Sequence, residues 1–314
     1  MSAPSAEGAR VAWQDVPVPV RTAIEEVCGA PVIEAVSQPG GFSPGVAARV
    51  RLSDGTRCFV KAASADRNAD TPRIHRTEAR MLGRLDPLIS AGRIPAPRLR
   101  GTAERGPWFA LVIDDVAGRQ PELPWRDGEL VTVLAALDRL AAAPAPRTLP
   151  PVGRLLRDAF AGWRALAKGP ADDRVDPWSR ARLPELAALE GTWTAHAAGS
   201  SLLHTDIRAD NLLLTGDGAV VVDWPGACRG AAFVDLVLFA PSVAMQGGPE
   251  PADLLARSRA GREASREQLA AVVCALAGYF TERSLQPPPP GLSALRRFQA
   301  AQAKVTRRWL AALL

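Results

Sequence analysis

The chain has 314 residues and a mass of 33.3 kDa; 47% of its residues are hydrophobic and 23% are charged. This balance allows a large buried core and excludes a disordered chain, a fibrous protein and a mini-protein. The formal net charge is +5, but the arginines are scattered rather than collected in one run, so the charge does not indicate a nucleic-acid partner.

The cysteines and the N-terminus exclude further classes of protein. Cys28, Cys58, Cys228 and Cys274 are far apart and form no CxxC pair. They are therefore expected to be small buried side chains rather than a zinc site, a redox motif or a disulfide framework. The N-terminus lacks the pattern of a signal peptide, and no stretch approaches the roughly 20 apolar residues of a membrane span. We expect a cytoplasmic protein without a membrane partner, either a monomer or a homodimer.

The first third of the chain is strand-like. Residues 1–11 are expected to be flexible. Between residues 32 and 116, short apolar runs such as VAARVRL and RCFVKAA alternate with turn signals, among them GGFSPG and the Ser53-Asp54-Gly55 turn. One helical stretch follows RCFVKAA. This part of the chain predicts a small antiparallel sheet with one inserted helix.

From about residue 126 the pattern becomes helical. ELVTVLAALDRLAAA and VGRLLRDAFAGWRALA are helical stretches, and after residue 230 helices resume, interrupted by prolines at 287–290. The chain ends in an arginine-rich amphipathic helix. We predict an α+β protein with two lobes: residues 1–116 form an N-terminal lobe with an antiparallel sheet, and residues 117–314 form a mainly helical C-terminal lobe.

One segment interrupts the helical half. In LLHTDIRADNLLLTGDGAVVVDW, two β-type runs flank a turn signal at residues 215–218. Asn211 and Asp223 are each six residues from Asp217, so a symmetric hairpin would set them opposite each other with Cβ atoms roughly 5 Å apart. Two oxygen ligands at that spacing suit Mg²⁺, which usually takes one or two protein carboxylates plus substrate phosphates. An ordinary hairpin with polar ends is the alternative.

The residues before this hairpin favour the catalytic interpretation. His204 to Asn211 fit H-x-D-x-x-x-x-N, the pattern of a phosphoryl-transfer loop. In that loop Asp206 would accept the proton of the attacking hydroxyl and Asn211 would hold metal. Arg208 could reach the transferring phosphoryl oxygens, or it could be a solvent-facing arginine. For His204, anchoring the loop is favoured over acid or base chemistry.

With these residues the sequence resembles the aminoglycoside phosphotransferase and choline kinase group, small-molecule kinases related in fold to protein kinases. The resemblance covers residues 20 to 280, and its most specific part is the catalytic segment. It implies a two-lobed kinase-like fold, ATP or GTP with Mg²⁺ as cofactors, and transfer of the γ-phosphoryl group to a small-molecule hydroxyl.

A kinase-type site needs a lysine on the third strand and a helix glutamate that steadies it. Lys61 ends RCFVK and is one of only three lysines in the chain. On the following helix Ile74, Glu78, Met81 and Leu85 form one apolar stripe. Glu78 lies within that stripe and needs a cationic partner if it is buried. We predict that Glu78 pairs with Lys61; a surface helix is the alternative.

The resemblance also implies nucleotide contacts through the backbone. GGFSPG occupies the place of the phosphate-covering loop, although Phe42 stands where G-x-G-x-x-G has its second glycine. A plain hairpin turn is the alternative there. Gly41, Phe42 and Ser43 are the implied phosphate contacts. VIDDVAG resembles the hinge of the family, where the carbonyl of Asp114 and the amide of Val116 would pair with adenine.

Asp235 is the only charged residue in AAFVDLVLFA. The resemblance implies that it accepts hydrogen bonds from the catalytic-loop backbone rather than taking part in the chemistry. Between Asp223 and Asp235 the chain has no Ser, Thr or Tyr, so a phosphorylation switch is excluded in that segment. A small-molecule acceptor and a constitutively assembled site are therefore predicted.

The charge of the helical half constrains the acceptor. Residues 201–314 carry ten acids and twelve bases, whereas each buried ammonium of a polycation needs a carboxylate partner. We predict an ATP- or GTP-dependent phosphotransferase acting on a neutral or weakly charged acceptor, such as a nucleoside-type or glycosylated antibiotic, in antibiotic inactivation or self-resistance. A metabolite kinase acting on a sugar, an amino alcohol or a glycated amine is the alternative. A non-catalytic nucleotide-binding pseudokinase is less favoured, because Lys61, Asp206, Asn211 and Asp223 are all present. A basic nucleic-acid-binding module is the third alternative and is also less favoured.

Overall fold

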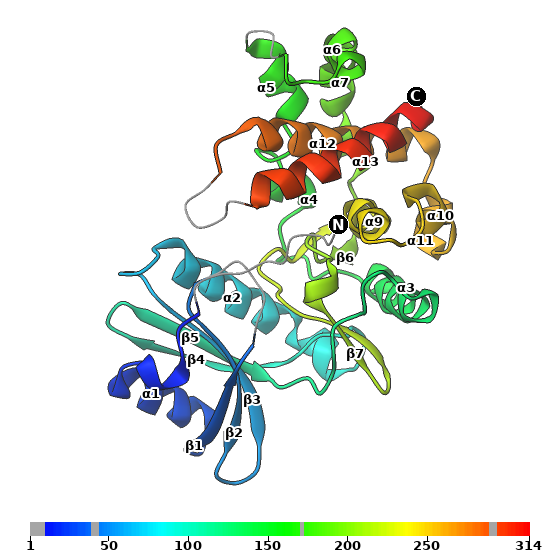
Figure 1. Ribbon diagram of the computed structural model, residues 1–314. Helices are drawn as coiled ribbons and strands as arrows, with labels where there is room; N and C mark the ends of the chain where they lie inside the picture. The colour runs from blue at the N-terminus through cyan, green and yellow to red at the C-terminus, as the bar shows by residue number, and fades with distance from the viewer. Residues whose placement is uncertain (1–9, 39–43, 170–172, 289–293) are drawn as a thin grey trace. The chain divides into compact units, whose positions relative to one another are not determined.

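The computed structural model describes residues 10–38, 44–169, 173–288 and 294–314. The chain divides into two compact units (Figure 1). The sheet unit takes its described residues from Ser5–Gln120 and Asp210–Pro225, and the helical unit takes them from Pro121–Ala209 and Gly226–Leu314. The chain therefore passes from the helical unit to the sheet unit and back again within the predicted catalytic segment.

A five-stranded antiparallel sheet with the order β1-β2-β3-β5-β4 forms the centre of the sheet unit. Its strands are β1 (Val32–Ser37), β2 (Val46–Leu52), β3 (Arg57–Ser64), β4 (Leu99–Arg105) and β5 (Trp108–Asp114), and two long helices, α1 (Val18–Cys28) and α2 (Asp70–Ser90), belong to the same unit. The predicted sheet with its inserted helix is confirmed, whereas α1 was not predicted.

The two faces of the sheet are covered differently because side chains alternate along a strand. Even-numbered residues of β2, β3 and β5 form one buried cluster with Val20 and Ile24 of α1. Odd-numbered residues face α2: the guanidinium of Arg76 lies 4.7 Å from the ring centre of Phe109, and Lys61 contacts Glu78. Lys61 therefore points to the side of the sheet that α2 covers.

The buried face of α2 differs from the predicted stripe. Glu78, Met81 and Leu85 are buried as expected, but Ile74 is 38% exposed, and the neighbouring His75 is buried in its place. The inward face follows Thr71, His75, Glu78, Leu82 and Leu85, which is the 3.6-residue period started one position later. The difference brings an imidazole into the interior of the unit.

The hairpin of β7 (Leu212–Thr215) and β8 (Gly218–Val221) belongs to the sheet unit. Its backbone bonds to residues near the end of the N-terminal segment: Arg119 and Leu214 exchange two hydrogen bonds of 3.0 and 2.7 Å, and the Val221 amide donates to the Pro95 carbonyl at 2.8 Å. Because of these bonds, residues 210–225 belong to the sheet unit. The first segment of that unit ends at Gln120, whereas the predicted boundary lay between residues 116 and 117.

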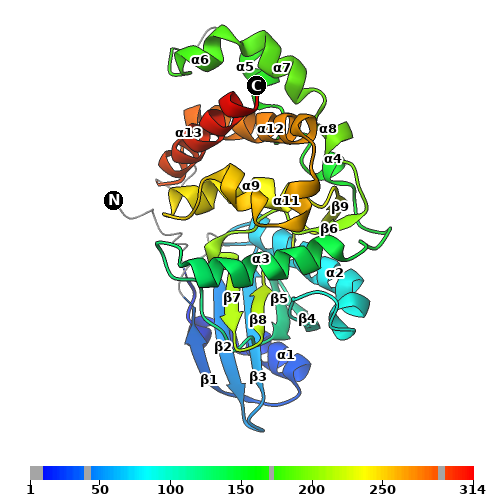
Figure 2. The same cartoon turned by 90° about the vertical axis from the view of Figure 1, so that its right-hand side faces the viewer.

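The helical unit is built around α12 (Arg266–Leu285), whose residues Ala270 to Gly278 are all buried. This helix begins with a capping box of Ser265 and Gln268, and it lies beside the final helix α13 (Leu295–Leu313) (Figures 1 and 2). The unit also contains α3 (Asp127–Ala142), α4 (Val152–Leu155), α5 (Gly162–Lys168), α6 (Pro177–Ala181), α7 (Leu183–Glu190), α8 (Trp193–His196), α9 (Val234–Met245), α10 (Pro251–Ala256) and α11 (Arg259–Glu263). Strands β6 (Ser201–Leu203) and β9 (Cys228–Gly230) pair within it.

The predicted helical stretch VGRLLRDAFAGWRALA is divided into α4 and α5. A close approach explains the break: a Cβ atom on Gly162 would lie 2.0 Å from the carbonyl oxygen of Gly278 in α12. The chain bends before Gly162 so that the start of α5 contacts α12 backbone to backbone. Among the described residues, no helix has the length and apolar character needed to cross a membrane.

Candidate active site

Three charged side chains meet in the sheet unit. The ammonium nitrogen of Lys61 lies 2.8 and 2.7 Å from the two carboxylate oxygens of Glu78, and 2.8 Å from Oδ1 of Asp223. The Lys61–Glu78 pair expected from the sequence is therefore present. Asp223 is a second partner of the lysine that the sequence did not predict.

The secondary structure fixes each member of this cluster. Lys61 is held in the middle of the sheet, with Ala47 of β2 and Leu111 of β5 as its ladder partners. Glu78 lies in the middle of α2 and is fully buried. Its carboxylate also accepts a hydrogen bond of 3.4 Å from the Trp224 amide. A rigid sheet and a buried helix therefore position the lysine and its partner.

Burial and charge act against each other at these groups. Burial alone would lower the pKa of Lys61, but the charges of Asp223 and Glu78 reverse that effect and the pKa is raised. Burial also raises the pKa of Glu78, and the charge of Lys61 opposes this rise. Lys61 therefore stays a cation across the physiological range and can attract the phosphates of an anionic ligand.

The hairpin register corrects the prediction for Asn211 and Asp223. Thr215 pairs with Gly218 across a two-residue turn, and Leu212 pairs with Val221. Continuing this register sets Asn211 opposite Val222, whose amide donates a hydrogen bond of 3.0 Å to the Asn211 carbonyl. The symmetric hairpin centred on Asp217 was therefore wrong by one residue, because the turn has an even number of residues.

Asp223 lies beyond the end of β8 in the left-handed region, with φ of 72°. An L-residue adopts this conformation only when its surroundings compensate the strain. Strand alternation no longer determines the direction of its side chain, and the carboxylate contacts Lys61. The left-handed backbone at Asp223, and not the predicted cross-strand pairing with Asn211, therefore brings the Asp223 carboxylate to Lys61.

Residues 204–209 of the predicted catalytic loop, which include Asp206 and Arg208, lie in the helical unit, whereas Asn211 belongs to the sheet unit. Asp235 of α9 is buried, and its oxygens accept hydrogen bonds from the amides of His204 at 2.7 Å and Thr205 at 2.8 Å. The His204 ring is fully buried, and its Nδ1 accepts a hydrogen bond of 3.2 Å from the Asp206 amide. The expected anchoring contact of Asp235 is therefore present, and the contacts of His204 are those of an anchor.

These anchors leave Asp206 accessible. Its side chain is 52% exposed, and Nη1 of Arg208 lies 3.7 Å from its Oδ1. Ile207 and Ala209 are buried on either side of Arg208. The loop therefore alternates buried apolar residues with polar side chains, and it presents a carboxylate and a guanidinium together.

Asp235 is ionised at neutral pH despite its burial. Burial raises the pKa of Asp235 to about 6, and the two backbone hydrogen bonds oppose the rise. Above that pH the carboxylate accepts from both loop amides. Thr205 has φ of 69°, in the strained left-handed region. Its amide donates one of the two hydrogen bonds to Asp235, so Asp235 holds the strained residue that precedes Asp206.

The predicted hinge is fixed by contacts that the sequence did not reveal. Arg49 of β2 donates to the carbonyl oxygen of Val116, and its Nε lies 2.9 Å from the Asp115 carboxylate. Asp114 is the last residue of β5 and pairs with Cys58 of β3 at the end of the ladder between these strands. The contacting residues are far apart in sequence, so no local pattern could have shown that Arg49 and Asp115 belong to this region.

The predicted phosphate contacts Gly41, Phe42 and Ser43 lie outside the described residues. The described end of that segment approaches β3 closely: a Cβ atom on Gly45 would lie 2.5 Å from the carbonyl oxygen of Ala62. Gly45 has φ of 134°, so glycine is required there for both conformation and space.

The donor set fits Mg²⁺ bound with phosphates. Asn211 and Asp223 both offer oxygen atoms, which hard divalent cations prefer. Within the described parts of the chain there is no group of three His, Cys, Asp or Glu side chains that could hold a metal ion alone. An ion held by Asn211 and Asp223 would take its remaining ligands from water or from a bound nucleotide.

Comparison with known proteins shows the family of the chain. The model of a family described as the phosphotransferase enzyme family matches residues 40–272, well over half of the chain. No curated protein matches the sequence. Among solved structures, an aminoglycoside phosphotransferase from Alicyclobacillus acidocaldarius is 16% identical, with a TM-score of 0.58 and 95% of each chain covered.

Two further solved structures have the same fold. An aminoglycoside phosphotransferase in ternary complex with ADP and hygromycin B is 14% identical, with a TM-score of 0.57 over 92% of this chain and 98% of that chain. A Haemophilus somnus protein assigned as a fructosamine-3-kinase is 13% identical, with a TM-score of 0.56 over 93% of this chain and 96% of that chain. The expected α+β kinase-like fold is confirmed, and the chain belongs to the phosphotransferase enzyme family.

Proposed function

We propose that this protein transfers the γ-phosphoryl group of ATP or GTP to a hydroxyl group of a small molecule. The observation that carries the proposal is the largely buried Lys61 side chain, whose ammonium is held between Glu78 and Asp223. A kinase-type site uses such a lysine to bind nucleotide phosphates and such an aspartate to hold metal. The ADP complex of one structural neighbour supports the choice of nucleotide.

The roles follow from what each group offers chemically. Asp206, with an exposed carboxylate, orients the acceptor hydroxyl and takes its proton as the oxygen attacks the γ-phosphorus. Arg208 and Lys61 neutralise charge on the phosphoryl oxygens. Asn211 and Asp223 would hold Mg²⁺, which lowers the charge of the phosphates when it is bound. Glu78 positions Lys61 and does not touch the reacting atoms.

The nucleotide base and the remaining phosphate contacts involve backbone groups. Asp114 and Val116 are the proposed adenine contacts, since Arg49 and Asp115 hold this segment against β2. Gly41, Phe42 and Ser43 remain the proposed cover of the phosphates. Because these are backbone interactions, the choice between ATP and GTP depends on carbonyl and amide positions rather than on side-chain identity.

The acceptor is proposed to be neutral or weakly charged. Several carboxylates of the helical unit already have partners within the chain. Glu190 caps α5 through the Trp163 and Arg164 amides at 2.9 and 3.0 Å, and Asp176 lies 2.8 Å from Arg307. Further engaged pairs are Glu250–Arg308, Glu263–Arg259, Asp127–Arg257 and Asp138–Ser258. A glycosylated or nucleoside-type antibiotic fits this balance better than kanamycin does.

A metabolite kinase is the second candidate. The structural neighbour assigned as a fructosamine-3-kinase favours it, because the same fold then serves a glycated amine as well as antibiotics. The two candidates share the reaction and differ in the acceptor. They are therefore separated by substrate tests and not by nucleotide binding.

The proposal is tested with the purified full chain, Mg²⁺, and ATP or GTP. ADP or GDP release is followed with neutral glycosides, nucleosides, glycated amines, kanamycin and streptomycin, and phosphorylated products are identified by mass spectrometry. Saturable phosphorylation of a neutral hydroxyl compound is expected. Rapid turnover of kanamycin or streptomycin, with neutral glycosides inert, would contradict the charge argument. Nucleotide binding without turnover of any acceptor would favour a pseudokinase.

The metal assignment has its own test. Asp223→Ala removes a carboxylate that the proposal places on Mg²⁺, so we expect loss of Mg²⁺-dependent turnover. Calorimetry should show that Mg²⁺ no longer strengthens nucleotide binding in this variant. Unchanged Mg²⁺–nucleotide affinity would refute the metal role of Asp223 while leaving the phosphotransferase activity itself open to the acceptor screen.

A further inference from the structure

The residues before α1 are not a loose tail where the structure describes them. Arg10 forms a parallel bridge with Gly45, and the Val11 amide donates a hydrogen bond of 3.0 Å to the Gly45 carbonyl. Val11 and Val16 are buried in the apolar cluster of the sheet. Within the stretch of residues 1–11 that was expected to be flexible, Arg10 and Val11 thus have a strand contact and an apolar anchor.

This contact places Arg10 at the end of the sheet that carries the phosphate-binding lysine. Gly45 directly precedes Val46, which pairs with Ala62, and the next residue of β2, Ala47, pairs with Lys61. The close approach of Gly45 to the Ala62 carbonyl holds the segments together at this point. Arg10 thus pairs with Gly45 at the start of β2, two residues before Ala47, the ladder partner of Lys61.

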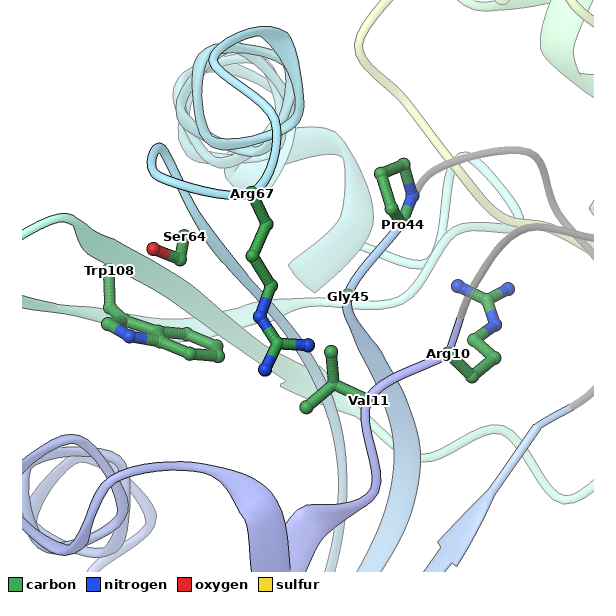
Figure 3. A pocket seen from close by; sticks show the side chains of 7 residues that line it. All are labelled: Arg10, Val11, Pro44, Gly45, Ser64, Arg67 and Trp108. Atoms are coloured by element: carbon green, nitrogen blue, oxygen red, sulfur yellow. The ribbon is translucent and has the colours of Figure 1, made fainter. Parts of the chain in front are cut away.

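The side chains of Arg10 and Arg67 lie on different sides of Gly45. Figure 3 shows the Arg67 guanidinium on the Trp108 and Val11 side of Gly45, whereas the Arg10 guanidinium lies across Gly45 from it. Arg10 is partly buried and Arg67 is exposed. The two arginines therefore line one small cavity but differ in their surroundings.

Arg10 lies within the electrostatic range of the candidate site. Burial lowers the pKa of Arg10, and the charge of Asp223 opposes that effect. The same region includes His75, whose Nδ1 is buried without a hydrogen-bond partner. Burial and the nearby charges of Lys61 and Arg10 hold the pKa of His75 at about 3, with Asp223 acting against them. His75 is therefore neutral at physiological pH and does not add to the charge.

Two cations act on Asp223 electrostatically in this region: Lys61, which also contacts Glu78, and Arg10. A divalent cation bound by Asp223 would draw that carboxylate away from both of them. Lys61 and Arg10 would then both attract phosphate oxygens.

We propose that Arg10 is a further phosphate-binding residue of this site and that it neutralises, together with Lys61, the polyphosphate of the bound nucleotide. This inference rests on the proposed function. It adds to the site a residue that lies well before the matched family region, which begins at residue 40.

The test compares Arg10→Met, Arg10→Lys and the matched control Arg67→Met in the full chain. Calorimetric titrations use ATP, ADP and adenosine in the presence of Mg²⁺, and thermal unfolding is measured for every variant. We expect Arg10→Met to weaken ATP binding by about tenfold or more, because it removes a charge-assisted contact. Adenosine affinity should not change, Arg10→Lys should keep most of the ATP affinity, and Arg67→Met should resemble the wild type.

The outcomes separate this inference from the proposed function. Unchanged ATP affinity in Arg10→Met, with the wild type binding ATP, would overturn the role of Arg10 alone. An equal loss for adenosine and ATP would also overturn it, because the residue would then support the fold and not the phosphates. A wild-type protein that binds neither ATP nor GTP would overturn the inference and the proposed function together.

Discussion

The sheet unit and the helical unit hold their functional residues by different means. In the sheet unit, Lys61 is held by charge, between two carboxylates at 2.7 to 2.8 Å, and its side chain is only 15% exposed. In the helical unit, the catalytic loop is held by backbone hydrogen bonds to Asp235, while the Asp206 side chain is 52% exposed. A cation that binds phosphate is more effective in a fixed position that is partly shielded from solvent. A general base must instead be accessible to a hydroxyl group that arrives from solvent.

This comparison predicts which properties each substitution changes. Loss of a group in the buried charge cluster should affect stability and nucleotide affinity together. Loss of the exposed base should affect turnover alone, because the backbone bonds that shape the loop remain. The following predictions are ordered by the size of the expected effect.

Asp206→Asn should give the largest effect on activity. The amide keeps the size of the side chain but cannot accept the proton of the acceptor, so turnover should fall by about 10²–10⁴-fold. Nucleotide affinity and the free energy of unfolding should change little, since the Asp206 side chain is half exposed. Steady-state kinetics and calorimetry on the same preparation test both parts. Near-normal turnover would contradict the assignment, and lost nucleotide binding would indicate a role in metal binding or in the fold.

Glu78→Gln tests the role of the buried carboxylate that pairs with Lys61 in the sheet unit. The substitution removes the charge that opposes Lys61 in a fully buried position, and we expect it to lower the free energy of unfolding by about 2–4 kcal/mol. ATP affinity should fall as well, because Lys61 is no longer held in place. Urea unfolding followed by tryptophan fluorescence, together with calorimetry, gives both quantities.

Glu34→Gln is the matched control for this substitution. Glu34 also pairs with a cation, Arg51, at 2.8 Å, but its side chain is 52% exposed. Exposed pairs contribute only about 0–1 kcal/mol, so the control should leave stability and ATP affinity nearly unchanged. Equal effects of the two substitutions would show that the charge of Glu78 has no special role.

The sequence predicted the elements that carry the candidate residues where these residues lie in short, contiguous segments. Asp206, Asn211 and Asp223 lie within one stretch, and Lys61 and Glu78 are separated by one turn and part of a helix. The spacing of such residues determines which element carries them. The hydrogen bonds of Asp235 to the loop backbone were implied by the family resemblance, with Asp235 as the only charge in an apolar stretch, and they are present.

The errors have specific physical causes. The register of Asn211 depends on the number of residues in the turn, and a two-residue turn shifts the pairing by one position. His75 was missed because Ile74 fits an apolar stripe better, although the helix turns His75 inward. Arg10 and Arg49 contact residues that are distant in sequence, Gly45 and Asp115. Such contacts depend on tertiary structure and leave no local pattern.

The pH dependence of stability tests the anchor of the catalytic loop. The pKa of Asp235 is about 6 in the folded protein, above its ordinary value of 3.8, because the side chain is buried. The folded state therefore favours the protonated form. The stabilising contribution of this group is fully present below about pH 3.8 and is lost as the pH rises through about 6.

The expected size follows from the difference between these two pKa values and is roughly 3 kcal/mol. Asp235→Asn does not titrate, so the difference in free energy of unfolding between wild type and variant should change by about 2 kcal/mol, most of this amount, between pH 4 and pH 7. Urea unfolding at a series of pH values measures it, and the subtraction removes the contributions of the other carboxylates. Parallel pH profiles for the two proteins would contradict the buried, titrating anchor.

The smallest expected effect concerns Asn211, whose position differs most from the prediction. Its amide is neutral, and the hairpin sets it opposite Val222 rather than Asp223. Loss of one neutral oxygen ligand should weaken Mg²⁺ binding without abolishing it, so Asn211→Ala should raise the Mg²⁺ concentration needed for half-maximal turnover by about tenfold. High Mg²⁺ should then restore part of the activity. Asp217→Ala, at the exposed turn of the same hairpin, is the control and should leave the Mg²⁺ requirement unchanged. If excess Mg²⁺ restores nothing while the variant unfolds like the wild type, Asn211 acts through the shape of the loop and Asp223 alone remains as the protein's metal ligand.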